Sequence, residues 1–205
     1  IASSPSVVST LVLPALAEFR SHYPNIDIAV HQENAKNVSE QLRMGFVEIG
    51  IHESWIDSEN LSCELLLKDT YGLVCSTEHP LASQKTVSFA DLSNSTVIQL
   101  SDDSAIRKRL DAETQIKHLL HTDIETSDAT SLIWMISQNL GVSVLPENAA
   151  MIPTNGSVCF LPIEGFEKTR KLSLISNKKR TVSPAAGAFM DVIRTVAQSH
   201  SKSAI

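Results

Sequence analysis

The chain repeats one pattern: a short apolar run of strand length, a turn rich in hydroxyl groups, and then apolar residues at helical spacing. Residues 1–16 show it first, where serines around Pro5 separate a few strand-like residues from Val8, Leu11 and Ala15. Spacings of three and four residues place apolar side chains on one helix face, whereas strands use alternation or short continuous runs. This unit recurs four more times, so the pattern predicts an α/β fold.

The same pattern places individual elements along the chain. Strands are predicted at 26–30, 47–51, 97–100, 119–125, 142–145, 157–162 and 170–176, and the stretch 61–76 is expected to form two strands broken at Lys68 and Asp69. Helices are predicted toward Ser21, from an N-cap at Asn37 to Gly45, after Ser88, after Ser104, from 126–128 to Gly141 with Leu140 facing a core, and from Ser183 onward. Pro14 is expected to bend the first helix or to mark a late start.

Strands that alternate with helices imply parallel sheets covered by helices on both faces. Two copies of the unit, separated near Ser76, indicate two Rossmann-like subdomains. The last helix has no sheet of its own, so it is expected to return to the first subdomain. The predicted division is therefore 1–76 with 177–205, and 77–176. Two crossing strands, 71–76 and 172–177, would join the subdomains.

Composition and charge restrict the function. The chain has 205 residues, 42% of them apolar, and a net charge of −6. This acidic balance leaves no basic stripe for nucleic acid, and the cluster at 178–180 is expected to be a solvated turn. No apolar run approaches membrane-spanning length. Cys63, Cys75 and Cys159 are odd in number and widely spaced, so they predict neither a disulfide framework nor a metal site and fit a reducing cytoplasm. The opening at Ile1 inside a strand leads us to expect a missing upstream segment.

Polar turns follow the predicted strands. Ligands of open parallel sheets bind at the carboxyl ends of the strands, and five turns are expected to meet there in one cleft between the subdomains. The candidate effector contacts are Ser3, Ser4, Ser6, Asn34, Ala35, Lys36, His52, Glu53, Gln99, Ser101, Ser104 and Ser127. Hydroxyl and amide groups dominate this set, with few pairs of nucleophile and base. The set therefore favours holding a small polar ligand over transforming it, and no catalytic residue, metal or cofactor is predicted.

Each candidate also has a simpler interpretation. The serine turn before the first helix suits an anion, but an ordinary N-cap with incidental serines would look the same. His52 could only satisfy a neighbouring carbonyl. Glu53 would repel an anion unless it faces away, pairs with His52 or Lys36, or meets an amino or hydroxyl group on the ligand. Trp55 and Trp134 are expected to be packing residues.

Five segments in order carry a family resemblance. They are IASSPSVVSTLVLPALAEFRSHYP, QLRMGFVEIGIHE, TEHPLA, NLGVSVLPENAA and RTVSPAAGAFMDVIR. Over nearly its whole length the chain resembles the effector-binding domain of bacterial LysR-type transcriptional regulators. It departs from the family pattern by one residue inserted before Pro14, and by Asn139-Leu140-Gly141 in place of Gly-x-Gly. The second departure affects only the expected geometry of that helix end.

The resemblance implies a periplasmic-binding-protein-like (type 2) fold with a small effector, expected to be anionic, in the cleft. It places ligand contacts on Ser4, Ser6, the 34–36 turn, Glu53, the 99–104 turn and Ser127. It implies a winged helix-turn-helix domain that this chain lacks, through which the full-length protein binds DNA, and RNA polymerase as a further partner. It also implies an antiparallel homodimer, with the first helix near the partner's 127–140 helix, and a tetramer in the full-length protein, with no membrane partner.

A solute-binding protein and an enzyme are the two alternatives to a cytoplasmic ligand sensor. A solute-binding protein that feeds a transporter shares the implied fold and predicts an export signal upstream, where a regulator predicts a helix-turn-helix. An enzyme is disfavoured because the sequence has no GxSxG elbow, no phosphate-cradling glycine loop, no metal-ligand spacing and no plausible pair of cysteine and histidine.

Overall fold

The computed structural model describes residues 1–53, 59–113, 116, 120–150 and 154–203, and Trp55 lies outside this range. The chain divides into two compact units. The first consists of Ile1–Lys68 and Lys171–Ile205, and the second is Asp69–Arg170. The chain passes from one unit to the other inside two strands, β4 (Leu61–Ser76) and β9 (Thr169–Asn177). The sequence-based boundaries at 76 and 177 are the C-terminal residues of the same two strands.

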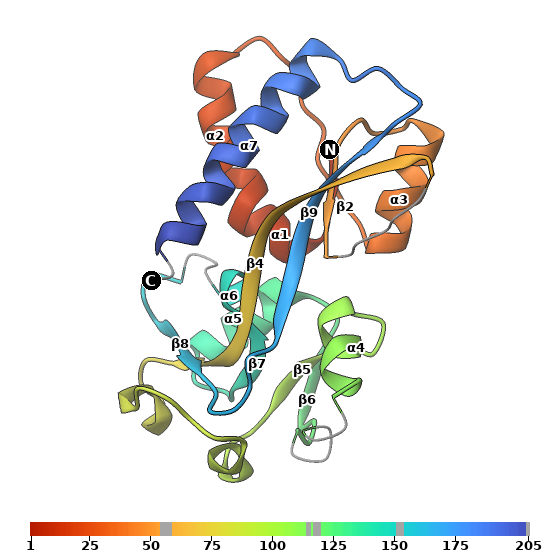
Figure 1. Ribbon diagram of the computed structural model, residues 1–205. Coiled ribbons are helices and arrows are strands. Elements are labelled where there is room, and N and C mark those ends of the chain that lie inside the picture. The colour runs from red at the N-terminus through yellow and green to blue at the C-terminus, as the bar shows by residue number, and fades with distance from the viewer. Residues whose placement is uncertain (54–58, 114–115, 117–119, 151–153, 204–205) are drawn as a thin grey trace. The chain divides into compact units, whose positions relative to one another are not determined.

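The first unit is built on short strands with a mixed pattern of pairing (Figure 1). Strand β1 (Ala2–Ser3) lies parallel to both β2 (His31–Gln32) and β3 (Gly50–His52). Strand β9 then pairs antiparallel with β3, so that His52 is opposite Ser173. The expected parallel arrangement therefore holds for β1, β2 and β3, while the returning strand β9 makes the sheet mixed.

The two faces of this sheet carry different helices. Helix α3 (Ala35–Met44) packs on one face through Val38 and Leu42, which contact Ala2 and Ile175. Helices α2 (Leu13–His22) and α7 (Pro184–Ser203) lie side by side in Figure 1 and share the other apolar cluster. That cluster includes Phe19, Ile49, Ile51, Leu172, Leu174, Phe189 and Ile193. The last helix therefore packs on the first unit, as the sequence predicted.

The first helix contains a π-helical segment immediately before Pro14. It runs through α1 (Pro5–Val7), a π-helix over Val8–Val12 and then α2. Proline has no N–H to donate and its ring crowds the carbonyl of the preceding turn, whereas a π turn widens the helix by one residue. The expected late start is thus wrong, because the helical segment begins at Pro5, and a π turn widens it immediately before Pro14.

Two other elements of the first unit differ from the prediction. Residues 26–30 have the expected alternating burial but are not assigned to a strand, which begins only at His31. Helix α3 is capped one turn earlier than expected, because the Asn34 side chain accepts a hydrogen bond from the Asn37 N–H at 3.0 Å. Gly45 ends α3 in the left-handed region with φ of 78°, as predicted.

The second unit combines an antiparallel group of strands with a parallel pair. Strand β4 pairs with β7 (Ser143–Pro146) and β8 (Val158–Pro162), while β5 (Ile98–Leu100) lies parallel to β6 (Ile124–Thr126). Its helices are α4 (Ala105–Asp111), α5 (Ala129–Ser137) and α6 (Glu147–Ala150), with 3-10 turns at Pro80–Ser83 and Phe89–Asn94. Ser88 and Asp91 form the capping box of the second 3-10 turn, which confirms the helical turn predicted after Ser88.

Helix α5 ends earlier than the sequence indicated. Its last residue is Ser137, and Asn139 adopts a left-handed conformation with φ of 56°. Asparagine tolerates this conformation better than most residues, so it ends the helix where the family pattern has glycine. Leu140 is consequently turned to solvent with 54% of its surface exposed, and the expectation that it faces a core is wrong.

Strand β4 is continuous, although two charged residues were expected to break it. Asp69 is buried, and its Oδ2 accepts a hydrogen bond from Arg170 Nε of β9 at 2.7 Å. Its Oδ1 accepts a second bond from the Asn148 N–H at 3.0 Å. A buried carboxylate is tolerated when a cation and other donors satisfy it. The partners that keep the strand unbroken are 79 and 101 residues away in sequence.

Removal of one partner should reveal how strongly this pair constrains the fold. Arg170→Met leaves the Asp69 carboxylate buried without its cation and is expected to lower the free energy of unfolding by about 3–5 kcal/mol. The double variant with Asp69→Leu should recover much of that loss, because no charge then remains buried. Urea titration measures both. Arg194→Met, which breaks the exposed pair with Glu64, serves as the control and should cost less than about 1 kcal/mol.

Candidate functional site

Three polar side chains form a row across the first sheet, at the carboxyl ends of β1 and β3. The parallel register sets Ala2 beside Gly50 and Ser3 beside Ile51. Ser4 keeps an extended backbone (φ −70°, ψ 149°), so the next step of this register sets it beside His52. His52 is itself opposite Ser173 of β9. Because paired residues share a face of a sheet, Ser4, His52 and Ser173 point to the same side, and we call them the polar row.

The polar row faces α3. A Cβ added to Gly50, two residues before His52, would meet Leu42 and Val38 of that helix. Ile175, two residues after Ser173, packs against the same two side chains. Alternate residues of a strand share a face, so His52 and Ser173 lie on the α3 side as well.

The atoms of the polar row lack hydrogen-bond partners. Within the described part of the chain, Ser4 Oγ, His52 Nδ1 and Ser173 Oγ are buried and form no hydrogen bond. His52 and Ser173 are each 0% exposed. Native proteins rarely leave buried polar atoms unpaired, since each costs about 1–3 kcal/mol. Three such atoms in one row make this edge of the sheet a candidate binding site.

Ser4 does not act as an ordinary N-cap. It occupies the N-cap position of α1, but its side chain makes no capping bond. The Val7 and Val8 N–H groups donate instead to the Ser4 carbonyl, both at 3.0 Å. Pro5, the first helical residue, has no N–H to cap. The Ser4 hydroxyl is therefore not required for the start of the helix.

His52 is neutral at physiological pH, because burial lowers its pKa to about 4. Its Nε2 lies 3.5 Å from Ser39 Oγ of α3, and that hydroxyl donates its proton to the Ala35 carbonyl at 3.0 Å. Ser39 can then only accept, so the imidazole proton belongs on Nε2. Nδ1 is left as an acceptor, and a group that pairs with it must bring an O–H or N–H donor.

The N-terminus of α3 lies at the same edge of the sheet. The Glu33 N–H donates to the Ser3 carbonyl at 2.9 Å, which brings the start of α3 next to the end of β1. The Asn34 side chain is used as the N-cap, while the N–H groups of Ala35 and Lys36 are among those that a helix leaves without an internal partner. This end of the helix dipole favours an anion, and the exposed Lys36 adds a cation.

Two acidic side chains and two further serines occupy the same region. The Glu33 carboxylate accepts hydrogen bonds from Asn37 Nδ2 at 2.8 Å and Gln41 Nε2 at 2.9 Å. Glu53 follows His52 and is half-buried. Ser3 is buried and donates to the Ile51 carbonyl at 2.7 Å, so its hydroxyl is committed to the sheet. Ser6 is buried in α1 and its carbonyl accepts from Thr10.

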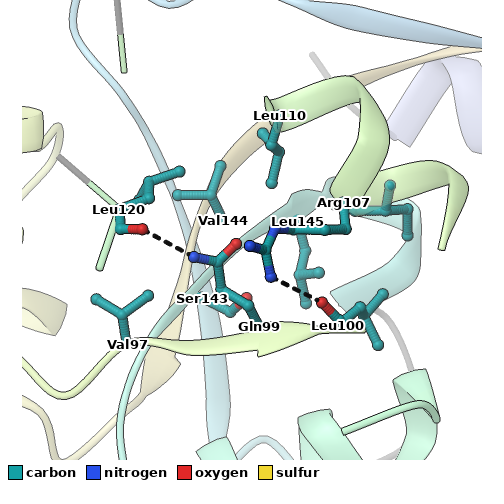
Figure 2. A pocket seen from close by; sticks show the side chains of 10 residues that line it. Val97, Gln99, Leu100, Arg107, Leu110, Leu120, Ser143, Val144 and Leu145 are labelled. Carbon is teal, nitrogen blue, oxygen red and sulfur yellow. Dashed lines mark hydrogen bonds between the residues drawn. The ribbon is translucent and has the colours of Figure 1, made fainter. Parts of the chain in front are cut away.

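In the second unit, Gln99 points into the interior. Figure 2 shows its amide among mostly apolar side chains, where Nε2 donates to the Leu120 carbonyl at 3.0 Å and to Thr122 Oγ1 at 2.9 Å. The space beside it is about the size of one water molecule. Arg107 borders this space but is held by Asp111 and the Leu100 carbonyl. This pocket suits a bound water rather than an effector.

The other candidates of the second unit lie where its parallel strands end. The Ser101 N–H donates to the Thr126 carbonyl at 2.9 Å, which brings the turn after β5 next to the turn after β6. Ser101 Oγ donates to Asp103 at 2.7 Å, while Ser104 occupies the N-cap position of α4 without a side-chain capping bond. Ser127 is exposed, and the next residue, Asp128, is the N-cap of α5.

The sequence-based set thus falls into two groups, one at an edge of each unit. Ser4, His52 and the 34–36 turn come together in the first unit, and Ser101, Ser104 and Ser127 in the second. Ser173 and Ser39 were missed. Ser173 could have been noticed, because it is a polar residue between Leu172 and Leu174 in an otherwise apolar strand. Pairing of β9 with β3, which no local pattern encodes, is needed to place it beside His52.

The described residues contain no group of three or more His, Cys, Asp or Glu side chains placed to hold a metal ion. Among the same residues, no helix has the length and apolar character needed to cross a bilayer.

Sequence comparisons give a consistent set of relatives. A family model described as LysR substrate binding domain matches residues 1–198. The transcriptional regulator YfeR of Shigella flexneri is 27% identical over 95% of this chain and 63% of its own length. The regulator CysL of Bacillus subtilis is 26% identical over 97% of this chain and 67% of its own length. The chain thus spans somewhat less than two thirds of the first of these relatives.

Solved structures show the same fold. The effector binding domain of QuiR in complex with shikimate has a TM-score of 0.72 at 20% identity, with 97% of this chain and 96% of that one covered. The regulatory domain of CcmR from Synechocystis in complex with 2-PG has a TM-score of 0.77 at 17% identity, with coverage of 96% and 95%. These likenesses establish the periplasmic-binding-protein-like (type 2) fold.

The buried His52 predicts a defined pH dependence of stability. Its pKa is about 4 in the folded chain against 6.5 in the unfolded chain, so between these values the unfolded state binds more protons. Stability is therefore fully present above pH 6.5 and is lost as the pH falls toward 4. Between pH 7 and pH 5 the loss assigned to His52 is about 2 kcal/mol. Urea unfolding of His52→Gln should lack this share, while the exposed His22→Gln should keep it.

Proposed function

The chain belongs to the family of LysR substrate-binding domains, and on this premise we propose that it is the effector-sensing part of a transcriptional regulator. The proposed effector is a small polar molecule that carries an anionic group. One observation supports this proposal most directly: the polar row of Ser4, His52 and Ser173 holds three buried atoms without partners, beside the N-terminus of α3. The proposed role is binding and not catalysis.

The chemistry of the row restricts the effector. His52 Nδ1 needs a donor, whereas the two serine hydroxyls can donate or accept. The helix N-terminus beside them favours a carboxylate or phosphate. A molecule that joins an anionic group to a hydroxyl or amino group satisfies both conditions. Shikimate and 2-PG, the small molecules bound to QuiR and CcmR, are suitable first probes.

The proposed effector contacts include residues besides the polar row. In the first unit they are Ser6, Glu53 and the 34–36 turn. In the second unit they are Ser101, Ser104 and Ser127. Gln99 is better placed to support the 101–104 turn from within the unit, since its amide is bound to Leu120 and Thr122. An effector regulates only if it binds one arrangement of the protein more tightly than another, and a tenfold shift requires about 1.4 kcal/mol of such preference.

The regulator interpretation is favoured over the alternative of a solute-binding protein. The curated relatives matched over most of this chain are transcriptional regulators. We propose accordingly that the full-length protein acts in the cytoplasm, where it binds DNA through a helix-turn-helix domain outside this chain and contacts RNA polymerase. This division of labour agrees with the acidic net charge of −6, which suits a sensing domain better than a DNA-binding surface.

Calorimetry tests the effector site directly. Shikimate, 2-PG, an aromatic acid, an amino acid and inorganic phosphate are titrated into the chain. For a molecule that binds, Ser4→Ala, His52→Phe and Ser173→Ala should each weaken affinity at least about fivefold, because each removes one hydrogen-bonding group. Ser21→Ala on exposed α2 is the matched control and should bind as the wild type does.

Circular dichroism and unfolding curves establish that the variants are folded. Wild-type affinity in the folded variants of the polar row would remove the row from the effector site. Binding that is strongest for probes without any donor group would contradict the role assigned to His52 Nδ1.

Exposed apolar residues support the antiparallel homodimer implied by the family. Leu13 on α2 is 54% exposed, and Trp134 on α5 is 49% exposed, so part of each side chain is open to packing from outside its own chain. Leu13 and Trp134 lie on the two helices that the family arrangement sets against each other between subunits, and Leu140 lies just beyond the end of α5. We propose that each helix covers the other across the dimer, and that the full-length protein assembles further into a tetramer.

Charge placed on these helices should separate the subunits. Leu13→Asp and Trp134→Lys are each expected to shift the chain from dimer to monomer in sedimentation-velocity experiments, because a charge would be buried at the interface. Phe46→Ser, at a residue 75% exposed outside both helices, is the control and should remain dimeric. A wild-type chain that is monomeric at high concentration would contradict the proposed interface.

A further inference from the structure

Two cysteines that are far apart in sequence meet in the second unit. Cys75 of β4 and Cys159 of β8 are opposite each other in the antiparallel register, and their sulfur atoms are 3.4 Å apart. From the sequence, the odd number and wide spacing of the three cysteines predicted no disulfide framework. Neither effector binding nor the proposed dimer makes use of this pair.

The backbone around the pair is suitable for a disulfide. The Thr77 N–H donates to the Ser157 carbonyl at 3.0 Å, and hydrogen-bonded pairs recur every second residue along such a ladder. Cys75 and Cys159 are therefore a hydrogen-bonded pair, for which the Cα atoms are about 5.5 Å apart. This separation lies within the usual range for disulfides. Bond formation requires the sulfur atoms to approach to about 2.05 Å, a movement that side-chain rotation largely supplies.

The two thiols have different surroundings. Cys75 is 0% exposed, and burial together with the neighbouring thiol raises its pKa to about 12, so it stays protonated. Cys159 is half-buried, with part of its surface open to solvent. An oxidant from solution therefore reaches Cys159 first, and the buried Cys75 thiol lies in contact with it. An accessible thiol next to a second thiol that can attack its sulfenic acid is one of the features of a reversible oxidation site.

We propose that Cys75 and Cys159 are a modification site, a dithiol that hydroperoxides convert into an intramolecular disulfide. In the first step Cys159 attacks the peroxide, the O–O bond breaks, and Cys159 sulfenic acid and an alcohol or water are formed. In the second step the Cys75 sulfur attacks the sulfenic sulfur, and the hydroxyl leaves with the Cys75 proton as water. Two thiols are oxidised and one peroxide is reduced, and cellular thiols restore the pair by exchange.

Oxidation would fasten β8 to β4, the strand that continues into the first unit. The disulfide closes a loop between residues 84 positions apart, which restricts the unfolded chain strongly. The oxidised protein is therefore expected to have a higher Tm than the reduced protein. The change is independent of the polar row, so failure of the effector proposal would leave it unaffected.

The experiment uses the reduced 205-residue chain and hydrogen peroxide. After treatment the chain is unfolded, labelled with N-ethylmaleimide and measured by intact mass and peptide mapping. The three labels of the reduced chain should fall to one, on Cys63, with the loss of two hydrogen atoms and a Cys75–Cys159 linked peptide. Tm should rise by several degrees, and dithiothreitol should reverse both changes.

Three variants make the assignment specific. Cys63→Ser should form the same disulfide and show the same rise in Tm, because Cys63 is outside the pair. Cys159→Ser and Cys75→Ser should form no intramolecular disulfide and show no rise. Conversion of Cys159 to sulfinic acid without a linked peptide, or a disulfide that involves Cys63 or a second chain, would overturn the proposal, and the wild-type mapping shows this even if Cys75→Ser fails to fold.

Discussion

The close approach of α3 to Gly50 is the constraint on which the first unit depends. An added Cβ at this position would lie 2.6 Å from Leu42 Cδ1 and 2.7 Å from Val38 Cγ1, which is closer than packed atoms allow. Because glycine has no side chain, the helix packs directly on the backbone of β3. This contact fixes the height of α3 above the sheet and brings Ser39 within reach of His52. The absence of a side chain at Gly50 thus determines which polar group of α3 lies next to the His52 imidazole.

Polarity changes abruptly between two adjacent rows of this sheet. Ala2, Gly50 and Ile175 form an apolar row under the middle of α3. Ser4, His52 and Ser173 form the next row, under the beginning of the helix. The apolar row supplies burial energy, while the polar row carries unsatisfied groups that cost stability until they are paired. Because the polar edge lies beside a well-packed interior, the unit can tolerate that cost.

Local patterns gave the fold class, the return of the last helix and most turns, because these depend on residues close in sequence. The polar turns that follow the strands of both units could also be located, because their residue types mark where a strand ends. What escaped prediction depends on pairing between distant segments. Asp69 looked like a strand breaker until Arg170 was placed beside it, Ser173 gained meaning only opposite His52, and Cys75 only opposite Cys159. The exposure of Trp134 and Leu140 could not be predicted either, because apolar residues at helical spacing fit a core and an interface equally well.

The π-helical segment over Val8–Val12 has a consequence for how the chain tolerates changes in length. Such a segment stores one surplus residue as a bulge, so the helix on either side of it keeps its own rotational setting. The one-residue insertion that the family resemblance implies before Pro14 would be absorbed there within about one turn. Before the π-helical segment, Ser4 remains in register with the neighbouring strands. After it, α2 remains packed against α7. A residue added to or removed from this segment would therefore leave the polar row and the contact between α2 and α7 in register.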